Sequence, residues 1–354
     1  MSLEDGWAAL NLEMPPRVPH TEYSVEGHWE LLAQVTGIAV DVASPGQVKQ
    51  RARDAFVGPR GWDLDLFWST LISREDLGPW RTRMGHAIYA AGGVDWDDHI
   101  HSPFAGPEEV LAFDPCQALG RPDPAGLARR FEEHYQANCC RSPGGVNMTG
   151  IYITCISGLI DLFGWDLLLL AAGTDPSAFG ELTRRYGAWI QHYFEALAAA
   201  DVPVVMVHDD MVWTQGPFIH PAWYRAYVFP NYRRHLAPLV ASGKKVLFTS
   251  DGNYTEFLDD LAACGVSGFV MEPTTDMGYV AARYGRTHAF IGNADTRILL
   301  SGPREAIRAE VERCMAIGKG CPGFFLAVGN HIPANTPVEH CLYYHQVYEA
   351  LSRR

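Results

Sequence analysis

Acidic, histidine and amide side chains follow several apolar runs in the second half of the chain. The run VVMV is followed directly by His208, Asp209 and Asp210, and the run KVLF ends shortly before Asp251. Three later apolar runs end in the same way. The further polar residues that follow these runs are Asn253, Glu272, Asn293, Asp295, Asn330 and His331.

These residue types could transfer protons, hold a cation or bind a polar substrate. A carboxylate or a histidine can act as an acid or a base, and a histidine is also a common metal ligand. We therefore predict a catalytic group that consists of Asp210, Asp251, Glu272 and His331. The predicted substrate-binding residues are His208, Asp209, Trp213, Gln215, Asn253, Asn293, Asp295 and Asn330.

A simpler role is open for each residue taken alone. Aspartate and asparagine are common helix N-caps, and loops that lead from a strand into a helix often contain them. Trp213 could equally form a pocket wall or pack on the next helix. Four ionisable groups at one place repel one another and are costly to remove from water, and this favours a functional site over four separate caps.

Strand and helix patterns alternate from residue 150 onward. Apolar strands are expected at 150–156, 202–210, 244–252, 266–273, 287–295 and 323–331, with a helical pattern after each. This alternation predicts a parallel α/β fold, and we predict a (β/α)8 TIM barrel with an elaborated N-terminal segment. We expect one domain over 1–354, with 1–60 as an N-terminal extension packed on the barrel. The ends of the strands would then meet at one mouth, where such barrels keep their sites.

Composition narrows the classes of partner. The chain has 354 residues, 47% hydrophobic, and a net charge of −13, which argues against nucleic acid or an anionic membrane as the main partner. Eight cysteines form no CxxC, which fits reduced thiols in a cytoplasmic protein. The sequence shows neither a signal-peptide pattern nor an apolar run long enough for a membrane span, nor a GxGxxG, P-loop or GxSxG motif.

One stretch outside these strand ends also concentrates ionisable residues. The segment 95–104, DWDDHIHSPF, contains three aspartates and two histidines. It could bind a metal or a substrate, or it could be an ordinary solvated loop.

Five motifs together resemble the uroporphyrinogen decarboxylase superfamily, which includes the true decarboxylases and the zinc- and corrinoid-linked methyltransferases. They are HDDM (208–211), HPAWYRAYVFPNYRR (220–234), GKKVLFTSDGN (243–253), GNADTRILLSGPREAIRAEVERC (292–314) and GNHIPANTPVEH (329–340). The resemblance implies a TIM barrel, as the strand pattern does, and a dimer as the superfamily's common assembly.

Departures from the decarboxylase pattern place the chain nearer the methyltransferase branch. The Arg-Gln-Ala-Gly-Arg-Tyr stretch that binds carboxylates in the decarboxylases is missing, and Arg17 is the only arginine among the first fifty residues. Thr70 stands where the resemblance leads us to expect the catalytic aspartate. The positions that match the zinc ligands of the methyltransferases hold Thr249, Asp251 and Asn330, so a thiolate zinc site is not encoded there.

The resemblance therefore implies methyl transfer from a small polar methyl donor to a corrinoid carried on a partner protein. Two alternatives stay open, namely a decarboxylase acting on uroporphyrinogen or a smaller acid, and a ligand-binding barrel without catalysis. A divalent metal such as zinc could bind through Asp251 and His331, or the acidic residues could contact the small-molecule substrate without a metal.

Overall fold

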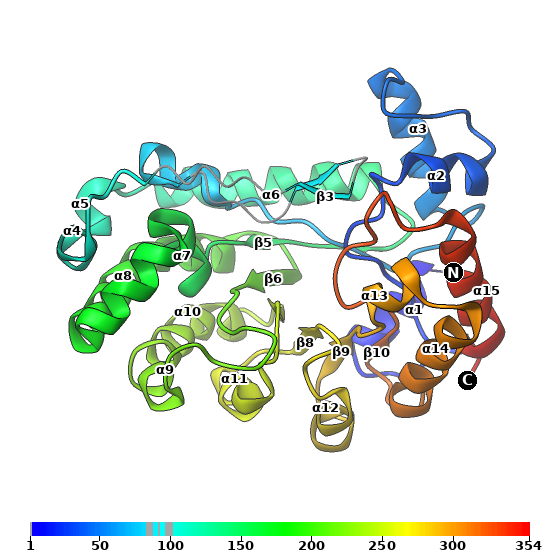
Figure 1. Cartoon of the computed structure of the whole chain (residues 1–354). Coiled ribbons are helices and arrows are strands. Elements are labelled where there is room, and N and C mark those ends of the chain that lie inside the picture. The colour runs from blue at the N-terminus through cyan, green and yellow to red at the C-terminus, as the bar shows by residue number, and fades with distance from the viewer. Residues whose placement is uncertain (1, 83–87, 91–92, 96–101) are drawn as a thin grey trace.

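The computed structural model describes residues 2–82, 88–90, 93–95 and 102–354 of the chain. Its main sheet contains six parallel strands in the order β10-β9-β8-β7-β6-β5, so strands that are neighbours in the sheet are also successive in the chain (Figure 1). These strands are β5 (Thr149–Ile151), β6 (Val204–His208), β7 (Lys245–Ser250), β8 (Gly268–Met271), β9 (Ala289–Ile291) and β10 (Phe324–Phe325). A separate antiparallel pair is formed by β2 (Ile88–Ala90) and β3 (Gly93–Asp95).

Shorter segments connect the two edges of this sheet. Residues 19–21 lie beside β10, because the Leu326 N–H donates to the carbonyl of residue 19 over 2.9 Å. The Asp65 N–H donates to the carbonyl of residue 20 over 2.8 Å, which places β1 (Leu66–Phe67) next in the ring. β1 pairs in parallel with β4 (Val146–Asn147), which precedes β5 in the chain. The TIM-barrel prediction is therefore confirmed, although individual hydrogen bonds rather than a long ladder join these segments.

Helices cover the outer face of the ring. Within the segment 1–60, residues 19–21 join the ring. The helices α2 and α3 of the same segment project at one edge in Figure 1. The α-helices are α1 (Ser2–Leu10), α2 (Trp29–Thr36), α3 (Gly46–Val57), α4 (Pro107–Ala112), α5 (Pro115–Ala118), α6 (Pro124–Arg141), α7 (Ile156–Thr174), α8 (Pro176–Ala199), α9 (Pro221–Tyr227), α10 (Phe229–Ala241), α11 (Leu258–Cys264), α12 (Met277–Tyr284), α13 (Thr296–Ser301), α14 (Arg304–Gly318) and α15 (Val338–Ser352). Two 3-10 helices are η1 (Arg74–Trp80) and η2 (Thr255–Phe257).

The first helix packs against the apolar interior of the barrel. Ala9 and Leu10 of α1 are buried in one cluster with Met206, Leu247 and other inward-facing strand residues. Successive strand residues point to opposite faces, so this set is separate from the larger core between the strands and the outer helices. The open end of the barrel is therefore the one at which the strands terminate.

Helix boundaries differ from the sequence prediction at three places. α7 begins at Ile156, inside the predicted strand 150–156, and continues through a kink at Gly164. The helical pattern after the predicted strand 202–210 divides into α9 and α10 at Val228, two residues before Pro230, because proline is well tolerated in the first turn of a helix. The helical pattern after the predicted strand 287–295 divides into α13 and α14 at Gly302 and Pro303.

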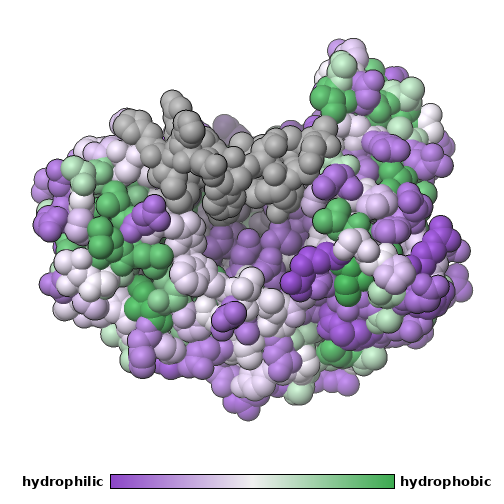
Figure 2. Space-filling view, viewed as in Figure 1, coloured by the Kyte–Doolittle hydropathy of each residue, from purple (hydrophilic) through white to green (hydrophobic). Residues whose placement is uncertain are grey.

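Among the described residues, α7 alone is long and apolar enough to cross a membrane, judged by length and composition. Of its most apolar window, 67% is buried inside the protein, as in a core helix. Leu170 on this helix is nevertheless 53% exposed, and Figure 2 shows an apolar patch over α7 and α8.

Candidate active site

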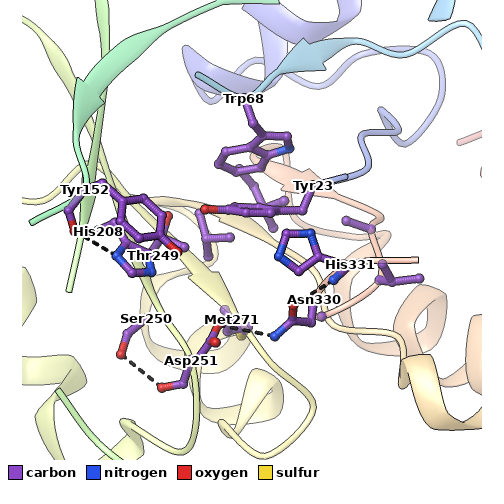
Figure 3. Close-up of a pocket in the computed structure, with 15 residues that line it drawn as sticks. Tyr23, Trp68, Tyr152, His208, Thr249, Ser250, Asp251, Met271, Asn330 and His331 are labelled. Carbon is purple, nitrogen blue, oxygen red and sulfur yellow. Dashed lines mark hydrogen bonds between the residues drawn. The ribbon is translucent and has the colours of Figure 1, made fainter. Parts of the chain in front are cut away.

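A cavity of about 90 Å³ lies where the barrel strands end. Residues from seven different strand ends reach it (Figure 3). Parallel strands in a barrel deliver the residues after their last hydrogen bond to one common space, which explains why side chains distant in sequence meet here. The lining residues are Tyr23, Trp68, Tyr152, His208, Thr249, Ser250, Asp251, Val270, Met271, Ile291, Ala327, Val328, Gly329, Asn330 and His331.

His208 and Asp210 form an ion pair at the end of β6. The His208 Nε2 lies 3.1 Å from Asp210 Oδ1, and the ring stacks on Tyr152 with 3.7 Å between centroids. Burial by itself would lower the pKa of His208, but Asp210 and Asp251 outweigh it and raise that pKa to about 9. The imidazole is therefore charged at neutral pH and compensates the Asp210 carboxylate.

Asp251 is a carboxyl group whose surroundings favour its protonated form. It follows β7, and its backbone N–H donates to Asp210 Oδ1 over 3.0 Å. Burial, together with the carboxylates of Asp210 and Glu272, raises the pKa of Asp251 well above its ordinary value. A neutral carboxyl group that lines a cavity can donate a proton to a ligand, which an ordinary surface aspartate cannot do at pH 7.

Glu272 is held behind the cavity wall by two donors. Its Oε2 accepts from the Gly252 N–H over 2.7 Å, and its Oε1 accepts from Asn330 Nδ2 over 2.7 Å. Asn330 Oδ1 accepts from the His331 N–H over 2.8 Å, and this contact directs the amide nitrogen towards the carboxylates. Asn330 Nδ2 also lies 3.4 Å from Asp251 Oδ1, so one amide links the two acidic side chains.

Three aromatic residues that the sequence prediction missed form much of the cavity wall. Tyr23 and Trp68 lie 5.1 Å apart between ring centroids, and His331 approaches Tyr23 edge-on at 5.3 Å. Figure 3 shows Tyr23 over the space that Asp251 borders on the opposite side. Tyr152 could have been found from the strand pattern, since it follows the apolar run of β5. Tyr23 and Trp68 come from the N-terminal part, outside the strand ends after residue 150 from which the site was predicted.

The predicted site residues fall into two groups. Those that line the cavity or contact its lining are His208, Asp210, Asp251, Glu272, Asn330 and His331. The other predicted residues lie behind the cavity wall or on the outer rim of the barrel.

Asp209 stabilises the beginning of α7. Its carboxylate accepts from the backbone N–H groups of Cys155 and Ser157 over 3.1 and 2.6 Å, and from the hydroxyl of Tyr232. Burial raises the pKa of Asp209 to about 6. These contacts fix the helix against the end of β6, so Asp209 supports the position of His208 and Asp210.

Two further predicted residues belong to a network behind the wall. Asn293 donates from Nδ2 to the carbonyl of Glu272 over 3.2 Å and accepts at Oδ1 from Arg313 over 2.9 Å. Asp295 caps α13 and pairs with Arg297 at 2.6 Å. Asn293 therefore helps to hold the Glu272 backbone.

The remaining predicted residues lie on the outer rim. Gln215 and Asn253 line a separate surface groove together with Glu256 and Asp259. Trp213 is 48% exposed and contacts Phe218 at 5.4 Å between ring centroids. The Asp- and His-rich stretch 95–104 lies largely outside the described residues.

The described side chains of the cavity form no thiolate zinc site. Thr249, Asp251 and Asn330 do line one cavity, as the resemblance to the zinc enzymes implies. None supplies a thiolate, however, and the Asn330 amide presents N–H donors to the two acids where a cation would require acceptors. Within the described ranges, no three His, Cys, Asp or Glu side chains gather closely enough to hold a metal ion. Ligation by Asp251 and His331 stays a prediction, and no step below depends on it.

The described lining of the cavity contains neither a lysine nor an arginine to bind a polycarboxylate. Its charged His208 is already paired with Asp210. Arg17 is bound to Asp5 at 3.0 Å and to Asp65 at 2.7 Å and is not among the lining residues.

Comparison with known sequences identifies the family. The sequence model described as uroporphyrinogen decarboxylase (URO-D) matches residues 141–350, more than half of the chain. The chain belongs to the URO-D family. The strand ends that carry His208, Asp251, Glu272 and Asn330 all lie within the matched part, whereas the URO-D match does not include Tyr23 and Trp68.

Individual relatives match over shorter stretches. A uroporphyrinogen decarboxylase from Chloroflexus aggregans is 30% identical over 177 residues, which is 48% of this chain and 47% of the relative. A uroporphyrinogen decarboxylase from Alkalilimnicola ehrlichii is 33% identical over 171 residues, or 47% and 45% of the two chains. The chain thus matches about half the length of these relatives. Among solved structures, a methyltransferase from Methanosarcina mazei aligns over 97% of this URO-D chain and 96% of its own, with a TM-score of 0.64 and 17% identity, which shows the shared fold.

Proposed function

We propose that this URO-D family member transfers a methyl group from a small polar methyl donor to a corrinoid carried on a partner protein. The observation that carries the proposal is the buried Asp251 carboxyl, close to Asp210 and Glu272, in a cavity of about 90 Å³ whose described lining includes no lysine or arginine; these surroundings raise the pKa of Asp251 well above its ordinary value. A donor with a leaving oxygen or neutral nitrogen needs a proton when its bond to the methyl carbon breaks. Asp251 would provide that proton.

The roles of the residues follow from their contacts. The donor's polar end would lie against Asp251, and its apolar part against Tyr23 and Trp68. As the bond from the methyl carbon to the leaving atom breaks, the leaving atom keeps the electron pair and takes the Asp251 proton. Asn330 Nδ2, 3.4 Å from Asp251 Oδ1, would then donate towards the carboxylate that is left. The charged His208 keeps the Asp210 carboxylate compensated throughout.

The corrinoid would supply the nucleophile that accepts the methyl group. It would approach from the open end of the barrel, and the fold shared with the Methanosarcina mazei methyltransferase supports this class of reaction. The partners that the proposal implies are a small-molecule donor and a corrinoid carrier protein.

Decarboxylation is the second candidate, because the family model and the matched relatives carry that name. Uroporphyrinogen has eight carboxylates, which would meet the acidic groups of Asp210, Asp251 and Glu272, with His208 already paired to Asp210 and no lysine or arginine among the described lining residues. The same neutral Asp251 could still protonate carbon after a smaller acid loses carbon dioxide.

The test is methyl transfer to added cob(I)alamin, followed in the visible spectrum with a panel of methoxylated and N-methylated donors. We expect turnover with at least one donor, and its loss in Asp251→Asn but not in Asp259→Asn, a matched change on the exposed surface of α11. Folded protein that methylates cob(I)alamin from no donor, even with a carrier protein, would contradict the proposal. Formation of coproporphyrinogen from uroporphyrinogen would favour the decarboxylase, and tight binding without turnover would favour a ligand-binding barrel.

A further inference from the structure

A second hollow, with a volume of about 260 Å³, lies outside the barrel ring between α3, α6 and the ends of β1 and β4. Trp68 lines both this groove and the barrel cavity. The next residue, Ser69, lines only the groove, as expected where successive strand residues point to opposite faces. The groove residues used below are Phe67, Trp68, Ser69, Asn138, Arg141 and Ser142.

Ser69 is held by two side chains of α6. Its Oγ lies 2.7 Å from His134 Nε2, and it accepts from Asn138 Nδ2 over 2.9 Å. Arg141 donates to Asn138 Oδ1 over 3.4 Å, which directs the Asn138 amide nitrogen towards Ser69. Asn138 occupies one acceptor direction of Oγ, and in the histidine tautomer whose Nε2 carries no hydrogen the Ser69 hydroxyl donates to His134.

His134 is suited to receive that hydrogen. Burial lowers the pKa of His134 below its ordinary value, and the charge of Arg141 lowers it further. The imidazole is therefore neutral at pH 7 and has a lone pair for the serine proton. A serine within hydrogen-bond reach of a neutral histidine is the arrangement that activates a hydroxyl nucleophile.

We propose that Ser69 and His134 form a nucleophilic pair that accepts the acyl group of a small carboxylic ester bound in this groove. The Ser69 Oγ attacks the carbonyl carbon, and His134 Nε2 takes the hydroxyl proton. The bond from carbon to the leaving oxygen then breaks, and His134 returns the proton to that oxygen, so that an acyl-serine and a free alcohol result. Water, activated by the same histidine, hydrolyses the acyl-serine to the acid.

The walls of the groove suit such an ester. Phe67 and Trp68 offer apolar surface for the acyl or alcohol part, and Arg141, one turn after Asn138 on α6, adds a positive charge to the groove that would favour a developing oxyanion. The simpler reading is that the contact of Ser69 with His134 only joins β1 to α6. The two readings differ in the reactivity of Ser69, because a purely structural hydroxyl is not nucleophilic.

The test treats the full-length protein with a fluorophosphonate probe and with p-nitrophenyl acetate. We expect covalent labelling at Ser69, located by peptide mass spectrometry, and release of p-nitrophenol with an initial burst. Ser69→Ala should abolish both, and His134→Gln should slow both at least tenfold. Ser142→Ala, which changes another serine of the same groove, should have no effect.

The pH profile separates a reactive pair from a structural contact. The burst rate of the wild type should rise with pH and level off below pH 6.5, because the pKa of His134 is lowered. Failure to label Ser69 in folded wild-type protein, or labelling that His134→Gln leaves unchanged, would overturn the proposal. Asp251→Asn should leave labelling intact, so this result is independent of the proposed methyl transfer.

Discussion

Two histidine–carboxyl pairs of similar composition occupy different parts of the barrel. At the mouth, His208 Nε2 lies 3.1 Å from Asp210 Oδ1. Between the first barrel segment and α15, His20 Nε2 lies 2.7 Å from Glu22 Oε1. Both pairs are buried, and in both the two residues are separated by one position in the sequence. Their electrostatic states are nevertheless opposite.

The surroundings explain the difference. At the mouth, the carboxylates of Asp210 and Asp251 outweigh burial and raise the pKa of His208 to about 9. In the inner pair, burial and the nearby Arg17 lower the pKa of His20 to about 3, and burial raises the pKa of Glu22 to about 8. The mouth pair is therefore an ion pair at neutral pH, whereas the inner pair is uncharged.

Their hydrogen bonds differ as well. Glu22 Oε1 also accepts from the Tyr344 hydroxyl over 2.9 Å, and its Oε2 accepts from the Val328 N–H over 3.1 Å. These contacts tie the first segment, α15 and the end of β10 together. His208 and Asp251 line the barrel cavity, whereas Glu22 borders the groove outside the ring. The comparison teaches that residue type and spacing do not determine the charge state of such a pair, and that the neighbouring charges do.

The largest expected effect is on activity at the mouth. Asp251→Asn removes the proton donor but preserves shape, so turnover should fall by about 10²–10⁴. The free energy of unfolding at pH 7 should be no lower than that of the wild type, because a buried acid next to two carboxylates is removed. Steady-state kinetics and urea unfolding measure both quantities. A clearly lower free energy of unfolding in Asp251→Asn would show that Asp251 stabilises the fold, as Glu22 is expected to do.

The next effect is on stability in the inner pair. Glu22→Ala leaves the Tyr344 hydroxyl, the Val328 N–H and His20 without their acceptor, and should lower the free energy of unfolding by about 3 kcal/mol. Urea unfolding at pH 7 provides the measurement. Glu349→Ala, an exposed change on α15, should stay within about 0.5 kcal/mol. Equal effects of the two substitutions would show that the network does not stabilise the fold.

The smallest expected effect is on the pH range in which each histidine stabilises the folded protein. The raised pKa of His208 gives stability that is present below pH 6.5 and is lost as the pH rises towards about 9. The lowered pKa of His20 gives stability that is present above pH 6.5 and is lost as the pH falls towards about 3. The free energy of unfolding should therefore change with pH differently in the wild type and in His208→Gln above pH 6.5, and differently in the wild type and in His20→Gln below pH 6.5. At the extremes of pH each difference should exceed about 1 kcal/mol. If both variants differed from the wild type in the same pH range, the opposite charge states of the two histidines would be contradicted.

Much of the barrel could be predicted from local patterns. The alternation of apolar runs with helical segments after residue 150 correctly predicts strands β6 to β10, and the polar residues at their ends include six that line or contact the cavity. The early part is different. β1 and β4 contain two residues each, and residues 19–21 join the ring through individual hydrogen bonds, so their places in the ring depend on contacts with neighbouring segments.

The sequence by itself determined the fold class, the family and the edge at which polar side chains gather, because strand periodicity and motif order are local properties. Only the tertiary structure decided which of those side chains reach a cavity. It placed Tyr23 and Trp68 across from Asp251, and it directed Asp209 to α7 and Asp295 to α13 instead. It also decided charge, since burial and partners distant in the chain, such as Tyr344 and Glu22 at 322 positions apart, set the protonation of otherwise similar acids and histidines.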